Sequence, residues 1–253
     1  MGISKRLLDE QSSFDPHATG AGSSGWQAPE QLLHGRQTRA VDLFSLGCVL
    51  FFCITGGRHP FGERFERDSN VLKGEPDLWP LQHMPEAAHL VGALLRTDPL
   101  ERPTAEEALL HPFFWSAEKR LAFLRDASDR VELEDREEGS LLLAAMESVG
   151  QSAAIGAWDV QLDKALLENL GKYRRYNSRS IRDLLRVIRN KCNHYRELPQ
   201  SVKELLGPLP DGFLSYFTGK FPHLLMEVYK VLYTHCKQED VVGKYFRNVH
   251  IQA

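Results

Sequence analysis

Residues 180–194 read SIRDLLRVIRNKCNH, and the interpretation of the whole chain starts from this stretch. Ser180 is a favoured residue for the start of a helix, and Asp183 follows three positions later, as in a capping box. With about 100° of rotation per residue, one side of such a helix is apolar, through Ile181, Leu184, Leu185, Ile188 and Cys192. The other side carries Arg182, Arg186, Arg189, Asn190, Asn193 and His194. The segment therefore predicts an amphipathic helix that packs by one face and offers cations, an amide and an imidazole on the other.

The charge around this helix differs from that of the whole chain. The 253 residues have a formal net charge of −3 and a pI near 6.4, which does not suggest a nucleic-acid binder. Residues 172–196, however, hold nine lysines and arginines against Asp183 alone, a local charge of +8. An acidic stretch at 126–147, with eight carboxylates, masks this block and is interpreted as a connector. We expect the basic block to meet a phosphate-rich partner, and a solvated helix face is the alternative.

The residue types near this helix suit cleavage of an RNA strand by its own 2′-hydroxyl. Such cleavage needs a base for the hydroxyl proton, a cation for the charge that develops on the phosphate, and an acid for the leaving 5′-oxygen. Histidine can serve in either proton transfer near neutral pH. Tyr173 and Tyr176 flank Arg174 and Arg175 just before the helix. This route requires no metal ion, and it excludes DNA because DNA lacks the 2′-hydroxyl.

The remainder of the chain predicts an all-α fold. Its 42% hydrophobic and 26% charged residues are typical of a folded protein, apolar residues recur at helical spacing, and no alternating run is long enough for a strand. The most apolar stretch, 43–57, has 15 residues, whereas a membrane span takes about 20. Four scattered cysteines without a C-x-x-C pair argue against a disulfide framework or a zinc site. Since no signal sequence follows Met1, we expect a soluble, cytoplasmic chain without a bound metal.

Four motifs in the first half resemble those of protein kinases. Ala28-Pro29-Glu30 resembles the A-P-E triplet that closes a kinase activation segment, and DLFSLG from Asp42 resembles the start of a large buried kinase helix. HPFG at 59–62 and DPLERP at 98–103 follow in kinase order. The resemblance implies that residues 1–115 are a partial kinase domain, comprising the activation segment and the C-terminal lobe. It also implies that Arg102 forms a buried ion pair with Glu30.

Kinase chemistry is not expected of these residues alone. The glycine-rich loop, its lysine and glutamate partners and the H-R-D catalytic loop precede the activation segment in a kinase, and Met1-Gly2 match only the end of the D-F-G element. The ATP and Mg²⁺ site of the kinase family is therefore expected to be largely missing from these 253 residues. Four serines lie where a kinase activation loop is phosphorylated, namely Ser12, Ser13, Ser23 and Ser24. They are candidate sites of phosphorylation by a full-length partner, and the alternative is that they are serines of a solvated loop.

The basic half resembles a ribonuclease domain. Residues 173–199, which include YRRY, SIRDLLRVIRNK and HYRELP, resemble the kinase-extension nuclease (KEN) domain shared by RNase L and the inositol-requiring unfolded-protein-response sensor, here in a plant-like form. In that family a kinase lobe is followed directly by an all-helical nuclease, which the resemblance places at residues 116–250. The resemblance implies His194 as general acid and Tyr176 as base, an assignment open to reversal, with Arg189 and Asn190 on the scissile phosphate. Lys172, Arg175 and Arg186 are further candidate phosphate contacts.

The resemblance also implies a biological role. It implies an endoribonuclease that cuts stem-loop RNA in mRNA processing during the unfolded protein response to ER stress, needs no cofactor for cleavage and leaves a 2′,3′-cyclic phosphate. Members of the family assemble as dimers on the cytosolic face of the endoplasmic reticulum, so we expect a homodimer or association with full-length family members, with RNA and not DNA as the nucleic-acid partner. The alternative, from a different class, is a non-catalytic fragment that binds and modulates full-length partners.

Overall fold

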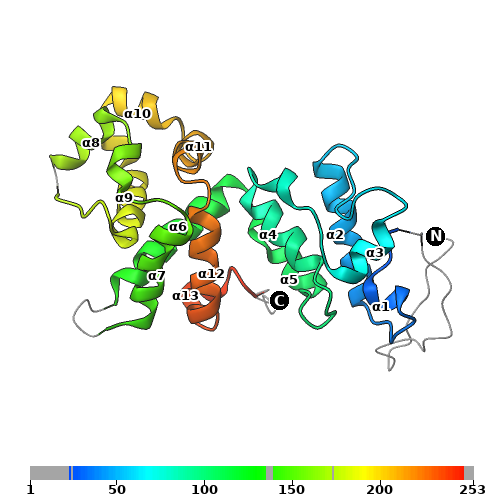
Figure 1. Ribbon diagram of the computed structural model, residues 1–253. Helices are drawn as coiled ribbons and strands as arrows, with labels where there is room; N and C mark the ends of the chain where they lie inside the picture. The colour runs from blue at the N-terminus through cyan, green and yellow to red at the C-terminus, as the bar shows by residue number, and fades with distance from the viewer. Residues whose placement is uncertain (1–22, 24, 135–138, 173, 248–253) are drawn as a thin grey trace, which may run out of the picture. The chain divides into compact units, whose positions relative to one another are not determined.

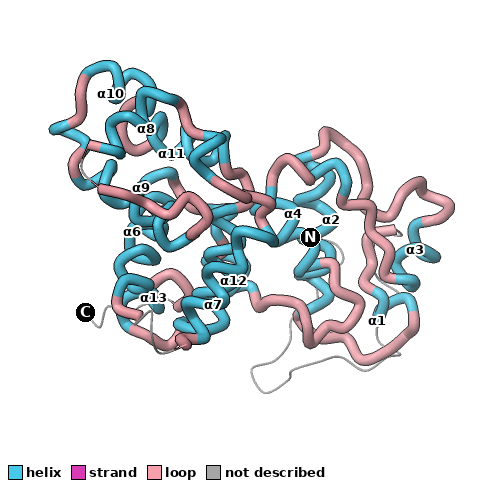
Figure 2. The backbone as a smooth tube through the Cα atoms, turned by 60° about the vertical axis from the view of Figure 1, so that its left-hand side comes forward, coloured by secondary structure: helices cyan, strands magenta, loops and turns pink. Residues whose placement is uncertain are grey.

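The computed structural model describes residues 23, 25–134, 139–172 and 174–247. Within these ranges every regular element is a helix, and Figure 2 accordingly shows helices and loops but no strand. The predicted all-α fold class is therefore confirmed. The chain divides into two compact units, Met1–Phe113 and Phe114–Ala253, two residues before the predicted boundary. No helix in the described ranges is both long and apolar enough to cross a membrane.

The first unit is built around one long apolar helix, α2. Its elements, coloured from blue to green in Figure 1, are α1 (Pro29–Leu32), α2 (Ala40–Ile54), α3 (Arg67–Lys73), η2 (Trp79–Leu81), α4 (Pro85–Leu94) and α5 (Ala105–Leu110), and η3 (Pro112–Phe114) spans the division. Phe44 and Phe51 of α2 are each 1% exposed. A Cβ on Gly47 would lie 2.9 Å from the Cβ of Leu94 in α4, so only glycine lets these two helices approach so closely.

The predicted ion pair between Arg102 and Glu30 is present in this unit. Nη1 and Nη2 of Arg102 donate to Oε1 and Oε2 of Glu30 at 2.7 and 2.8 Å. The remaining N–H groups donate to the backbone carbonyls of Arg96, Ala40 and Thr97 at 2.8, 2.9 and 3.1 Å. All five guanidinium donors are thereby used, so one side chain joins α1, the start of α2 and the turn at 96–97.

The other kinase-like residues differ in their exposure, and three of them lie outside the described ranges. Ala28 and Pro29 are buried where α1 begins, with Pro29 in its first turn. Asp42 is exposed in the first turn of α2. Ser23 is exposed, whereas Ser12, Ser13 and Ser24 fall outside the described residues. Phosphorylation of these serines stays a prediction.

The second unit has helix α9 at its centre. Its elements are α6 (Ala117–Glu132), α7 (Leu141–Ser152), η4 (Trp158–Gln161), α8 (Lys164–Gly171), α9 (Ile181–Asn193), η5 (Tyr195–Glu197), α10 (Gln200–Leu206), α11 (Asp211–Lys220), α12 (Leu224–Cys236) and α13 (Asp240–Gly243). Figure 1 shows α6, α7, α12 and α13 grouped towards one end of α9, and α8, α10 and α11 towards the other. Helices α6 and α7 both pack directly on α9, and α12 packs on α6 and α7.

The predicted helix is present as α9, but the prediction that one of its faces is open to solvent is wrong over the first two turns. Residues 181–188 are all buried, including Arg182 at 6% and Arg186 at 3% exposure. The acidic stretch interpreted as a connector instead provides about the last two turns of α6, with Asp129 and Glu132, and part of α7, with Glu147. These helices pack against α9 and bring the negative charge that its arginines need in order to be buried.

Candidate active site

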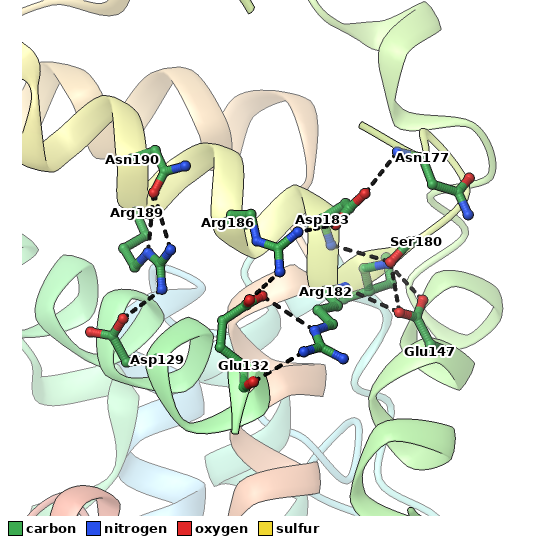
Figure 3. Close-up of polar contacts among 11 residues, drawn as sticks. Asp129, Glu132, Glu147, Asn177, Ser180, Arg182, Asp183, Arg186, Arg189 and Asn190 are labelled. Atoms are coloured by element: carbon green, nitrogen blue, oxygen red, sulfur yellow. Dashed lines mark hydrogen bonds and ion pairs between the residues drawn. The ribbon is translucent and has the colours of Figure 1, made fainter. Parts of the chain in front are cut away.

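The start of α9 is fixed by its own cap and by a carboxylate from α7. The backbone N–H of Asp183 donates to Ser180 Oγ at 3.2 Å, as the predicted cap requires. Glu147 accepts from Ser180 Oγ at 2.7 Å and from the backbone N–H of Ile181 at 2.8 Å. The Asp183 carboxylate accepts from the backbone N–H of Asn177 at 2.7 Å instead of closing a capping box onto Ser180. These contacts, drawn in Figure 3, join the segment before α9 to its first turn.

Three cations of the basic block are buried inside the second unit. Glu132 of α6 accepts from Arg182 Nε at 3.2 Å and from Arg186 Nη2, so one carboxylate bridges two arginines (Figure 3). Arg186 also donates to Asp183 at 2.9 Å. Lys191, 7% exposed, donates to Asn169 Oδ1 at 2.5 Å, and burial lowers the pKa of its ammonium group. The local charge of +8 is therefore only partly presented to solvent.

Glu132 stays charged in this setting. Burial on its own would raise the pKa of the Glu132 carboxyl, but the hydrogen bonds from Arg186 and Arg182 outweigh burial and hold that pKa below its ordinary value. The carboxylate and the two guanidinium groups thus form an ionic cluster between α6 and α9.

The three predicted phosphate contacts have different surroundings. Lys172 and Arg175 are exposed in the segment that leads into α9, together with Arg174 and Arg179. Arg186 is 3% exposed and bound to Glu132 and Asp183. Burial places Arg186 out of reach of a phosphate, so the prediction for this residue does not match its position, and we assign it to the ionic cluster.

Three of the four predicted catalytic residues are joined by hydrogen bonds. Arg189 donates from Nε and Nη2 to Asn190 Oδ1, both at 3.2 Å. Asn190 Nδ2 donates in turn to the phenol oxygen of Tyr176 at 3.3 Å. The segment that carries Tyr176 is held by Trp158, whose ring meets the Tyr176 ring edge to face with centroids 6.4 Å apart, and whose indole N–H donates to the Ser180 carbonyl at 3.0 Å. A phenol, an amide and a guanidinium are thereby presented together.

His194, the fourth predicted residue, caps the C-terminal end of α9. Its backbone N–H donates to the Asn190 carbonyl at 3.0 Å, so the two residues are one helical turn apart. The Nδ1 atom lies 3.1 and 3.2 Å from the carboxylate oxygens of Glu197. Since a carboxylate only accepts, Nδ1 is the donor and Nε2 is left to react. The imidazole is 63% exposed, so a substrate can reach it.

Two carboxylates that touch these residues were not predicted from the sequence. Asp129 of α6 accepts from Arg189 Nη1 at 2.6 Å (Figure 3), and Glu197 holds His194. Asp129 belongs to the acidic stretch, whose excess of carboxylates near a basic helix was the available signal. Within the described residues no group of three or more histidine, cysteine or acidic side chains could hold a metal ion.

Comparison with known proteins divides the chain in the same way as its structure. Residues 120–246 match the family model described as Ribonuclease 2-5A, and residues 1–114 match the protein kinase domain. These segments correspond to the second and first structural units.

Curated relatives match across nearly the whole chain. The serine/threonine-protein kinase/endoribonuclease IRE1a of Arabidopsis thaliana is 59% identical over 247 residues, covering 98% of this chain and 29% of the relative. The human serine/threonine-protein kinase/endoribonuclease IRE2 is 42% identical over 255 residues, covering 97% and 27%. A Schizosaccharomyces pombe protein, the sensor for unfolded proteins in the ER ire1, is 41% identical over 267 residues, covering 96% and 25%. This chain thus spans less than a third of each of these relatives. By the match over its second unit the chain belongs to the ribonuclease 2-5A family, and it carries a segment similar to the protein kinase domain ahead of that unit.

Proposed function

We propose that this chain is an endoribonuclease that cuts structured, stem-loop RNA. The observation that carries the proposal is the hydrogen-bonded series from Tyr176 through Asn190 to Arg189, with His194 one helical turn further along α9. The names of the relatives, two of which are kinase/endoribonucleases, support the same activity.

The reaction assigned to this site is internal transfer of the phosphodiester. Tyr176, acting as base in its phenolate form, takes the proton of the 2′-hydroxyl while the 2′-oxygen bonds to phosphorus. The bond from phosphorus to the 5′-oxygen breaks, and His194, acting with both ring nitrogens protonated, donates a proton from Nε2 to that oxygen. The products are a 2′,3′-cyclic phosphate and a 5′-hydroxyl, and the two residues recover their starting protonation states from solvent. Reversed roles for Tyr176 and His194 balance equally well.

The remaining residues stabilise charge and place the RNA. Arg189 and Asn190 hold the scissile phosphate, where a preorganised guanidinium is worth most because negative charge increases in the transition state. Lys172 and Arg175, exposed ahead of α9, contact neighbouring phosphates. None of these steps requires a metal ion or a cofactor. A DNA strand is not a substrate because it has no 2′-hydroxyl.

We place this activity in mRNA processing during the unfolded protein response. The Schizosaccharomyces pombe relative is named as a sensor for unfolded proteins in the ER, which supports that setting. We further propose that the chain works as a homodimer or with longer family members, on the cytosolic side of the endoplasmic reticulum.

Cleavage of a hairpin RNA by a His194→Ala variant tests the catalytic assignment. We expect cleavage to be lost while the helical circular dichroism is unchanged, because His194 is exposed at a helix end. His235→Ala is the matched control, since it removes another exposed histidine from the second unit. Cleavage by His194→Ala at the wild-type rate would exclude the proton-transfer role.

Two further measurements on the wild-type chain separate this proposal from its alternatives. Addition of EDTA should leave the rate unchanged, and strong inhibition would indicate a metal-dependent route. Specific activity should rise steeply with protein concentration if a dimer is the active form. Absence of cleavage at high micromolar concentration would favour a non-catalytic fragment that modulates longer partners.

A further inference from the structure

We propose that Asp129 is a positioning residue of the nuclease site and acts through Arg189. This inference rests on the proposed endoribonuclease function. Asp129 lies on α6, a helix that supplies none of the four assigned catalytic residues. Its Oδ1 accepts from Arg189 Nη1 at 2.6 Å, with the aspartate side chain 57% and the arginine side chain 19% exposed.

The contacts of Arg189 come from two directions. Asn190 accepts from Nε and Nη2, but it is the next residue on the same helix. Asp129 accepts from Nη1 and ties the guanidinium to a second helix (Figure 3). An arginine side chain has several rotatable bonds, so a contact from a second element restricts it far more than a contact from its neighbour alone.

The arrangement leaves Arg189 able to bind a phosphate. A guanidinium has five N–H groups, and these contacts use one on Nε, one on Nη1 and one on Nη2. Each terminal nitrogen therefore keeps one N–H that these contacts do not use, and a phosphate oxygen can accept from such a group. Asp129 binds through a single nitrogen and does not use these two N–H groups.

The opposite role for Asp129 would be an inhibitory contact that keeps Arg189 from the substrate. The two roles predict changes of opposite sign. Loss of a positioning carboxylate lowers the catalytic rate, whereas loss of a competing carboxylate raises it.

Steady-state cleavage of a hairpin RNA by Asp129→Ala, Asp129→Glu and wild type tests the proposal. We expect Asp129→Ala to lower kcat about tenfold without raising KM, because removal of a negative charge near the phosphate does not weaken RNA binding. Asp129→Glu should recover part of the rate. Glu118→Ala, which removes an exposed carboxylate from the same helix, is the control and should match wild type. An unchanged or increased kcat in Asp129→Ala would overturn the proposal.

A double-mutant cycle with Arg189→Lys tests whether Asp129 acts through Arg189. Lysine has no planar guanidinium for Asp129 to orient, so in this background Asp129→Ala should change kcat by less than about twofold. An equal loss in both backgrounds would contradict action through Arg189.

A readout that does not depend on cleavage keeps this proposal separate from the proposed function. In ¹⁵N-labelled protein, the Nε–H group of Arg189 should become more mobile in Asp129→Ala and stay unchanged in Glu118→Ala. Unchanged mobility in Asp129→Ala would overturn the positioning role. If the wild-type chain does not cleave RNA, but the Nε–H group of Arg189 is more mobile in Asp129→Ala than in wild type, the proposed function is refuted. The contact between Asp129 and Arg189 is then still established.

Discussion

Arg186 of α9 and Glu132 of α6 form an ion pair inside the second unit, where the arginine side chain is 4% and the glutamate side chain 23% exposed. Arg182 binds the same carboxylate, so two cations of the basic block share one acid of the acidic stretch. The exposed cations of the block lie mainly in the segment before α9, at Lys172, Arg174, Arg175 and Arg179, and at Arg196 beyond it.

Replacement of Glu132 should destabilise the second unit. Glu132→Gln keeps an acceptor oxygen but leaves two buried guanidinium groups without their shared charge, which we expect to cost about 2 kcal/mol. Amide hydrogen exchange in α9, followed by mass spectrometry, should accelerate about 30-fold if the unit opens as a whole. Glu118→Gln, on the exposed part of α6, is the control. Equal protection of α9 in the two variants would contradict a stabilising role for the ion pair.

Acid should weaken the same unit. The pKa of Glu132 is held below its ordinary value of 4.5, and the hydrogen bond from Arg130 lowers the pKa of Glu239 in the same direction. A carboxyl with a lowered pKa in the folded state binds fewer protons there than in the unfolded state. Its contribution to stability is therefore present above about pH 4.5 and is lost as the pH falls through the folded-state pKa.

Urea unfolding between pH 3 and pH 6 measures this dependence. The free energy of unfolding of the second unit should rise with pH over this window, and Glu132→Gln should show a shallower rise than wild type because one such carboxyl is gone. Parallel curves would show that Glu132 does not contribute to the pH dependence.

The first unit depends on Arg102 in the same way. Arg102→Lys should destabilise it by about 2 to 3 kcal/mol, because an ammonium group cannot bind both oxygens of Glu30 and also reach the backbone carbonyls of Ala40, Arg96 and Thr97. Arg96→Lys, which changes an exposed guanidinium in the same region, should have little effect. The midpoint of thermal unfolding, measured for both variants, tests this prediction. Equal midpoints for Arg102→Lys and Arg96→Lys would contradict the stabilising role of Arg102.

Local signals in the sequence predicted part of this structure well. The Ser180 cap and the periodicity after it predicted α9, since both depend on neighbours within a few residues. The pair between Arg102 and Glu30 is separated by 72 positions, and it was predicted only because the motifs around both residues resemble those of kinases.

The burial of α9 could not be predicted from its own periodicity. A helical projection places Arg182 and Arg186 opposite the apolar stripe, and it does not show which helix will cover them. Glu132 lies 50 positions from Arg182, and its acidic neighbourhood was interpreted as a connector. The contact of Asp129 with Arg189 has the same origin, since it depends on the packing of α6 against α9.

The central claim is that the α9 site cleaves RNA by attack of the 2′-hydroxyl. The most direct test of this claim uses one hairpin RNA in two forms. The cleaved position is first mapped with the unmodified RNA, and the second form carries a 2′-O-methyl group on that nucleotide alone. We expect the unmodified RNA to give a 2′,3′-cyclic phosphate and a 5′-hydroxyl, and the methylated RNA to stay intact. Cleavage of the methylated RNA at the same position, or products with a 3′-hydroxyl and a 5′-phosphate, would contradict the claim.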